Sequence, residues 1–228
     1  MTLTGMHYYE TSGKVKFWGG LSKRQTHTIL TMEQIMKTNG HGTVELRTER
    51  MILRRYHPED APELYKEFGT DTEMYRYSGW NPYATPEMAQ DTVRGFIENY
   101  NDDHFYGWAM ESDDVLLGTI GAYDYKDDRI EVGFSIARAY WGQGYATEAL
   151  KAVLEYLTDH EGISCVTAWC ASENTGSKRT LEKAGMSLVK TEKGGLSVGN
   201  RVYDKLTYDY RRRIEADLHT ENVHYEKY

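Results

Sequence analysis

The fold is decided by the stretch Ala139-Tyr-Trp-Gly-Gln-Gly-Tyr-Ala-Thr-Glu-Ala149, which places two glycines in one turn. An alternating apolar strand, residues 130–137, precedes the turn, and a strongly amphipathic helix follows it. Glycine lets the backbone adopt positive φ and approach a ligand closely. The free N–H groups and the dipole of a helix N-terminus favour an anion. We therefore predict that this turn holds a phosphate.

The length and charge of the chain limit the possible classes of protein. Its 228 residues suit one domain with extensions. We predict a disordered N-terminal extension over 1–43, one domain over 44–212 and a charged tail over 213–228. A formal net charge of −8 and a pI of about 5.5 argue against nucleic-acid binding. No apolar run approaches the ~18 residues of a membrane span, so we expect no membrane partner.

The two cysteines, Cys165 and Cys170, predict neither a disulfide nor a metal site. A spacing of five on one strand places their side chains on opposite faces. Metal spacings such as CxxC are absent from the sequence. We therefore expect a reduced, cytoplasmic setting and no bound metal.

Apolar alternation and helical periodicity predict an α+β fold in three layers, with a mixed central sheet of about seven strands and helices on both faces. The polar connection 126–128 predicts a hairpin. The strands are expected at 44–56, 105–111, 115–125, 129–137, 164–170, 186–192 and 201–210. The helices are expected at 58–68, 85–100, 142–159 and 174–184.

Two common phosphate-binding folds do not fit the turn. A dinucleotide fold needs G-x-G-x-x-G, but the sixth position is Thr147, and a hairpin rather than a βαβ unit precedes the turn. A P-loop needs Gly-Lys-Ser or Gly-Lys-Thr, and the chain offers only the scrambled order Gly176-Ser-Lys178. Both folds are therefore disfavoured.

Three ordered motifs resemble the GNAT acetyltransferase superfamily, and within it the ribosomal-protein N-acetyltransferase branch, the RimJ/RimL-like enzymes. Trp141-Gly-Gln-Gly-Tyr-Ala146 resembles the acetyl-CoA pyrophosphate loop, Q/R-x-x-G-x-G/A. Similarity to the branch extends to Thr48-Glu-Arg-Met-Ile-Leu-Arg-Arg55 and to Glu173-Asn-Thr-Gly-Ser-Lys-Arg-Thr-Leu-Glu-Lys-Ala-Gly-Met186. Trp141 departs from the Q or R of the superfamily, but an aromatic residue there is usual in this branch. The resemblance implies a GNAT fold.

The resemblance also implies which residues bind acetyl-CoA. Backbone N–H groups of the turn would hold the pyrophosphate: Gly142, Gln143, Gly144, Tyr145 and Ala146. In the family the strand 130–137 separates from the strand at 166–170, and the gap admits the pantetheine arm. Main-chain N–H groups of that strand would then bind the arm and polarise the thioester carbonyl: Phe134, Ser135 and Ile136. A plain turn before a helix is the alternative for the glycines.

Glu131 and Ser177 are the candidate catalytic residues. Glu131 would act as the general base, although a solvated or salt-bridged strand residue is the alternative, and Asp124 and Tyr125 are weaker candidates. Many GNAT enzymes protonate the leaving CoA thiolate with a Tyr seven positions after the motif Asn, but that position here is Leu181. In the RimL-like branch a Ser three positions after the Asn is thought to take this role, and Ser177 fits. Asn174 would bind the pantetheine; alternatively, Asn174 and Ser177 only cap the last helix.

The aromatic segment 75–83, with Tyr77 and Trp80, lies where this family places the wall of its acceptor site, although it could equally be core under a loop. The resemblance implies transfer of acetyl from acetyl-CoA to a primary amine by direct attack. The acceptor would be a protein N-terminus, with a small amine such as a polyamine or an antibiotic as the alternative. A non-catalytic CoA-binding sensor is the rival class. We expect a monomer or a homodimer.

Overall fold

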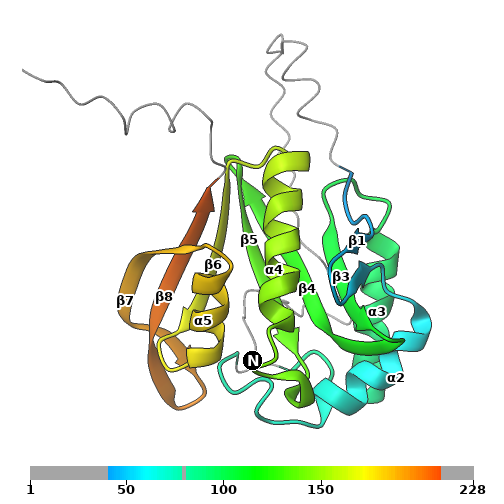
Figure 1. The fold of residues 1–228 in the computed structure, drawn as a ribbon. Coiled ribbons are helices and arrows are strands. Elements are labelled where there is room, and N and C mark those ends of the chain that lie inside the picture. The colour runs from blue at the N-terminus through cyan, green and yellow to red at the C-terminus, as the bar shows by residue number, and fades with distance from the viewer. Residues whose placement is uncertain (1–40, 79–80, 212–228) are drawn as a thin grey trace, which may run out of the picture.

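The computed structural model describes residues 41–78 and 81–211, which form one eight-stranded sheet with helices on both faces (Figure 1). The strand order is β1-β2-β3-β4-β5-β6-β8-β7. This arrangement confirms the predicted α+β class. The strands are β1 Leu46–Arg47, β2 Ile52–Arg54, β3 Tyr106–Ser112, β4 Val115–Lys126, β5 Arg129–Ile136, β6 Cys165–Ala171, β7 Ser187–Val198 and β8 Arg201–Arg211. The helices are α2 Ala61–Leu64, α3 Pro86–Asn99, α4 Tyr145–Glu155 and α5 Thr175–Lys183.

The eighth strand arises because the predicted strand 44–56 is two short strands. Thr48 and Met51 close a turn between β1 and β2: the Thr48 amide donates to the Met51 carbonyl (2.9 Å), and the Met51 amide donates to the Thr48 hydroxyl oxygen (3.0 Å). The turn satisfies the backbone groups locally, so the chain reverses direction and β1 pairs antiparallel with β2.

The packed chain begins before Val44, the predicted start of the domain. The Thr43 side chain is buried, with its hydroxyl donating to the Phe105 carbonyl (2.8 Å) and accepting from the Gly107 amide (2.9 Å). His41 also contacts the domain, since its amide donates to Glu161 Oε1 at 3.0 Å. The rest of the predicted extension, up to residue 40, and the tail over 213–228 lie outside the described residues.

The hairpin predicted at 126–128 forms, and β3 and β4 form a second hairpin, because aspartates supply the turn conformation in both. β3 and β4 are joined by Asp113-Asp114, and β4 and β5 by Asp127-Asp128. All four aspartates have φ between 50° and 62°. Asp and Asn tolerate this left-handed region better than most residues, and two-residue hairpins require it at both positions.

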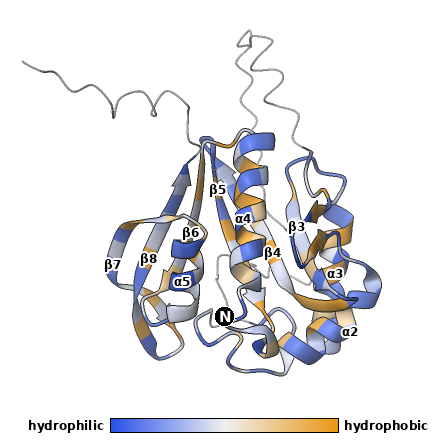
Figure 2. Ribbon diagram, viewed as in Figure 1, coloured by the Kyte–Doolittle hydropathy of each residue, from blue (hydrophilic) through white to orange (hydrophobic). Residues whose placement is uncertain are grey.

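The central sheet carries a hydrophobic core on each face. On β3, Trp108 and Met110 pack in the core that α4 covers, while Ala109 belongs to the core beneath α3. The apolar residues of α4 repeat at helical spacing and point at the sheet, and they alternate with hydrophilic residues along the helix in Figure 2. They are Ala146, Ala149, Leu150, Val153 and Leu154. Burial of both faces of β3 fixes its register.

Two predicted helices differ from the structure. The predicted helix 142–159 begins at Tyr145, because Gly142 and Gly144 have φ of +75° and +89° and cannot belong to a right-handed helix. Its last turn, Tyr156–His160, is a π turn. The predicted helix 58–68 is broken into a 3₁₀ turn, the four residues of α2 and a π turn over Tyr65–Gly69.

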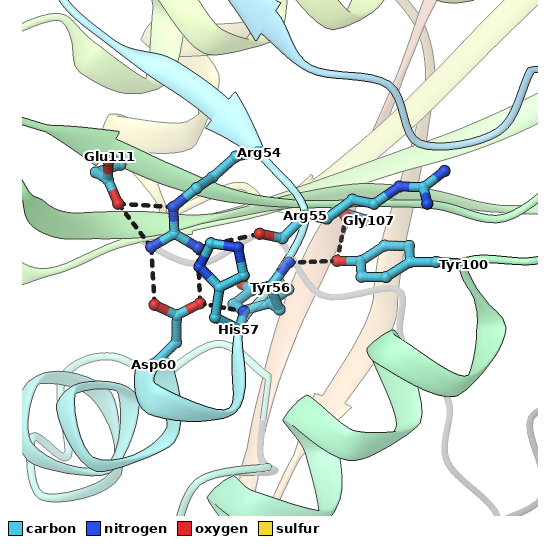
Figure 3. Close-up of polar contacts among 8 residues, drawn as sticks. All are labelled: Arg54, Arg55, Tyr56, His57, Asp60, Tyr100, Gly107 and Glu111. Carbon is cyan, nitrogen blue, oxygen red and sulfur yellow. Dashed lines mark hydrogen bonds and ion pairs between the residues drawn. The ribbon is translucent and has the colours of Figure 1, made fainter.

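A buried ion-pair network joins β2, β3 and the start of α2 (Figure 3). Arg54 donates to both carboxylate oxygens of Asp60 at 2.8 Å and to Glu111 at 2.6 Å. Asp60 also accepts from the His57 amide at 2.8 Å. The Arg54 and Asp60 side chains are only 15% and 9% exposed. Hydrogen bonds to Asp60 hold the pKa of Arg54 above its ordinary value, so the guanidinium stays charged.

We expect Arg54→Met to lower the free energy of unfolding by about 3–5 kcal/mol, because it leaves two carboxylates without their shared cation. Urea denaturation monitored by tryptophan fluorescence measures this. Arg94→Met is the matched control, since Arg94 and Asp91 form an exposed pair, 62% and 54% accessible, and such a pair is worth about 0.5 kcal/mol or less. Equal losses in both variants would contradict a structural role for the buried network.

Candidate active site

The glycine turn leaves a row of backbone N–H groups at the start of α4. Gly142 and Gly144 are both left-handed, and Gly144 is the N-cap of α4. The first bond of the helix runs from the Glu148 amide to the Gly144 carbonyl (3.0 Å). The preceding amides, from Tyr145 to Thr147, therefore have no carbonyl acceptor within the helix. A row of free N–H groups at a helix N-terminus is a site for an anion.

The side chains of the turn bind back onto the protein rather than into this row. Gln143 Nε2 donates to the Ala139 carbonyl at 2.8 Å. The Trp141 indole donates to the Ile136 carbonyl at 2.6 Å. Both contacts fix the turn from behind. The structure therefore leaves the backbone of the turn, and not these side chains, to meet a ligand.

The glycine turn is held in this form by the Arg50 bracket, which consists of the contacts of Arg50 and Thr48 with Gln143, Tyr145 and Glu148. Arg50 Nη1 donates to the Gln143 carbonyl (3.0 Å), and Arg50 Nε donates to Glu148 Oε2 (2.7 Å). The guanidinium carbon lies 4.3 Å from the centre of the Tyr145 ring. Glu148 also accepts from the Thr48 hydroxyl at 2.7 Å. The bracket neutralises a carboxylate that would otherwise face an anion at the first turn of α4.

β5 and β6 separate beside the turn. They pair in parallel only at Arg129, Ile130 and Glu131 of β5, and Figure 1 shows them diverging beyond this point. The Ile130 carbonyl accepts from the Thr167 hydroxyl of β6 (3.2 Å), so it points toward β6. Backbone groups alternate along a strand. Those of Phe134 and Ile136 therefore point to the same side, where β6 no longer pairs with them, while those of Ser135 point to β4.

Asn174 and Ser177 lie at the start of α5. The Asn174 side chain accepts from the Ser177 amide at 3.1 Å, which is the cap geometry expected of this residue type. The Ser177 side chain is fully buried, and its hydroxyl has no hydrogen-bond partner among the described residues. A buried hydroxyl usually has a partner. The helix cap is therefore present, and Ser177 retains one unused polar atom.

Glu131 lies on the face of the sheet opposite to α4. Its neighbours on β5, Ile130 and Val132, pack in the α4 core, whereas Glu131 faces the other way. The indole of Trp169 on β6 donates to Glu131 Oε1 at 2.8 Å, across the point where the strands separate. Burial raises the pKa of Glu131 above its ordinary value, and hydrogen bonds from Tyr123 and Trp169 oppose the shift. Glu131 is therefore neither fully solvated nor salt-bridged within the described chain.

Aromatic residues flank this face. The Tyr77 hydroxyl donates to the Glu173 carbonyl at 3.2 Å, just before Asn174, and the Tyr77 ring lies 5.4 Å from that of Tyr203 on β8. Tyr77 is thus brought to the start of α5. Trp80, the other predicted acceptor-site residue, lies outside the described residues.

The weaker candidates for the base, Asp124 and Tyr125, lie near the end of β4, next to the residue that pairs with Glu131. Asp124 adopts a left-handed conformation (φ 57°) in the bulge at the end of β4. Tyr125 is 54% exposed and stacks on His104 at 6.3 Å. No metal-binding group of three or more His, Cys, Asp or Glu residues occurs within 41–78 and 81–211. None of the described helices is long and apolar enough to cross a membrane.

The family model for the acetyltransferase (GNAT) domain matches residues 50–187, which is more than half of the chain. The chain belongs to the GNAT acetyltransferase family. It is similar to a protein described as uncharacterized N-acetyltransferase YoaA from Bacillus subtilis (strain 168), with 33% identity over 144 residues, 61% of this chain and 81% of the relative.

Solved GNAT structures share the fold. An acetyltransferase of the GNAT family from Bacillus anthracis is 24% identical and has a TM-score of 0.66, covering 74% of this chain and 98% of that one. RimL, a ribosomal L7/L12 alpha-N-protein acetyltransferase in complex with coenzyme A, is 15% identical with the same TM-score and the same coverage. This GNAT protein is therefore an acetyl-CoA-dependent N-acetyltransferase, as the resemblance predicts.

Four residues near the site were missed from the sequence: Arg50, Glu148, Trp169 and Lys205. Arg50 lies inside the motif Thr48–Arg55 and Glu148 inside the glycine-turn stretch Ala139–Ala149, so an arginine and a carboxylate in two separate stretches were the available signal. Trp169 reaches Glu131 through the register of β6 with β5, and the Lys205 ammonium of β8 lies 4.6 Å from the centre of the Trp169 ring through the register of β6 with β8. No local pattern of the sequence specifies these registers.

We expect Gly144→Val to raise the KM for acetyl-CoA by at least about tenfold. Valine resists φ of +89°, and its side chain would meet Arg50 Nη2, which lies 3.3 Å from the position of the added Cβ. Steady-state kinetics with varied acetyl-CoA measure this. Gly199→Val is the control, because Gly199 has φ of +56° with nothing within 4 Å, in the turn between β7 and β8. A normal KM in Gly144→Val would remove the turn from the cofactor site.

Proposed function

We propose that this GNAT enzyme acetylates the α-amine of a protein N-terminus, with Glu131 as the general base. The observation that carries the proposal is the position of Glu131. It lies where β5 and β6 separate, on the face opposite to α4, and the Trp169 indole holds its carboxylate. A base at this point faces whatever enters the gap from the acceptor side. The aromatic pair Tyr77 and Tyr203 would form the wall of the acceptor site.

A single carboxylate suits an α-amine better than a lysine side chain. The attacking nitrogen must be neutral, and an α-ammonium with a pKa near 7.7 loses its proton at a cost of about 1 kcal/mol at pH 7. A lysine ammonium with a pKa near 10.4 costs about 4–5 kcal/mol. A weak base, acting directly or through one water, is sufficient for the first and poorly matched to the second. The raised pKa of Glu131 makes it a better base than an ordinary glutamate.

The geometry suggests how acetyl-CoA would lie. Its pyrophosphate would bind backbone N–H groups of Gly142 to Ala146, in the glycine turn and at the start of α4. The pantetheine arm would enter between β5 and β6, where the Phe134 backbone and the Ile136 amide face the gap. The Ile136 carbonyl already accepts from the Trp141 indole. Ser135 was predicted to bind the arm with Phe134 and Ile136, but its backbone N–H faces β4 and would not reach the arm. Asn174 would then contact the arm from the start of α5.

The proposed reaction forms one C–N bond and breaks one C–S bond. The neutral amine attacks the thioester carbon, and the carbonyl oxygen gains charge that N–H groups of β5 would stabilise. Glu131 accepts the proton that the nitrogen loses. When the tetrahedral intermediate collapses, the CoA thiolate leaves and accepts a hydrogen bond from the unpartnered Ser177 hydroxyl. The proton that Glu131 accepted passes through water to the thiolate, which completes the products, an amide and a thiol, and restores the carboxylate.

Thiol release from acetyl-CoA across an acceptor panel tests the proposal. The panel contains peptides with a free N-terminus, N-terminally blocked lysine peptides, a polyamine and an aminoglycoside. We expect thiol release with the free N-termini and a mass gain of one acetyl group on the first residue. Release with only the polyamine or the aminoglycoside would support a small-amine enzyme instead. Tight CoA binding without release by any acceptor would support a sensor.

We expect Glu131→Gln to lower kcat about 10²-fold, most strongly at acidic pH where the neutral amine is scarce. The same change should raise the melting temperature at pH 7–8. Because burial raises the pKa of Glu131 in the folded state, its stabilising contribution is complete below the unfolded pKa. That contribution is lost as pH rises through the folded pKa. Gln keeps an oxygen for Trp169 and removes the charge.

Activity profiles and calorimetry over pH 4–9 measure both effects. A purely structural Glu131 predicts a different pair of results, in which the Gln variant loses stability and activity together. A wild-type pH profile of kcat in the variant would remove Glu131 as the base.

A further inference from the structure

Lys205 places a positive charge on the acceptor face, and no ion-pair partner for it occurs among the residues that the structure describes. Its ammonium lies over the Trp169 ring, 4.6 Å from the centre, and the same indole donates to Glu131. Lys205 pairs with Ala171 across β6 and with Glu192 across β7. Among residues 41–78 and 81–211, no carboxylate lies within 4.0 Å of its ammonium. Trp169 thus separates one carboxylate, Glu131, from one free cation.

Among the described residues, the carboxylates nearest to Lys205 do not neutralise its ammonium. Glu192 is the obvious partner, but its carboxylate is bound to Lys190 at 2.9 Å. Glu131 is held by Trp169, and Lys205 acts on it only at longer range. Lys205 is also half-buried rather than extended into solvent, so its cation is fixed beside the indole. A fixed ammonium with free donors is a point of attachment for an anion.

We propose that the acceptor carries a carboxylate a few bonds from its amine, and that Lys205 binds this carboxylate while Glu131 takes the amine proton. This rests on the proposed function, since it requires an amine at Glu131. In such an acceptor the amine would face Glu131 and the carboxylate would face Lys205, with the Trp169 indole between the two protein groups. The carboxylate can be the side chain of an acidic residue near a peptide N-terminus or the α-carboxylate of a free amino acid.

Matched acceptors test the proposal in two arms. The first arm compares the peptide amides Ser-Asp-Ala and Ser-Asn-Ala, and the second compares free serine with serine amide. In at least one of the two pairs, we expect the wild-type enzyme to favour the acceptor that carries the carboxylate by about tenfold or more in kcat/KM. In Lys205→Met the preference should fall to near one through a higher acceptor KM, with the KM for acetyl-CoA unchanged. Lys205→Arg should retain the preference.

Lys193→Met is the matched control, because Lys193 is an exposed residue of β7 and its loss makes the same change in net charge. This variant should keep the wild-type preference. A wild-type enzyme that favours the neutral member of both pairs, or neither member, overturns the proposal and leaves the proposed function intact. Equal loss by Lys205→Met on acidic and neutral acceptors also overturns it. If no amine releases thiol from acetyl-CoA, the proposed function itself is contradicted, and the carboxylate proposal falls with it.

Discussion

The site depends on one constraint: β5 and β6 run side by side but pair over only three residues. A parallel pair normally continues its hydrogen bonds along both strands. Here the ladder stops at Glu131, and β6 does not pair with the β5 backbone beyond it. In the proposed function this separation admits acetyl-CoA from the α4 side, where the glycine turn lies, and the amine from the face that carries Glu131. The two reactants would then meet from opposite sides of one sheet.

Charge is arranged differently at the glycine turn and at Glu131. At the turn, the acidic Glu148 would repel an anion, and Arg50 cancels it while fixing the Gln143 carbonyl. The helix dipole and free amides are then left to attract a diphosphate. Glu131, by contrast, remains unpaired with any cation within 4.0 Å in the described chain. The net charge of −8 thus does not describe either local environment.

The sequence was sufficient where a local rule applies. The apolar stripe of α4, the hairpin at 126–128 and the left-handed glycines follow from periodicity and backbone sterics. These features locate the turn and α4, although the helix begins at Tyr145 rather than at Gly142. It was insufficient where register decides the neighbour. Trp169 reaches Glu131 only because β6 pairs with β5 at Thr167 and then diverges. The break in the predicted strand 44–56 was missed because the Thr48–Met51 turn uses neither Gly nor Pro.

If the turn binds the cofactor as proposed, the Arg50 bracket makes cofactor affinity a property of the whole tertiary structure. The Arg50 amide and Glu148 are 98 residues apart in sequence, so the turn is supported only when the segment between β1 and β2 is docked on α4. Coupling between two equilibria is reciprocal. A ligand held by the turn therefore stabilises the docked N-terminal segment by the same free energy that docking contributes to its binding. With the cofactor at the proposed site, a substitution far from the turn that loosens this segment would weaken cofactor binding without touching the cofactor.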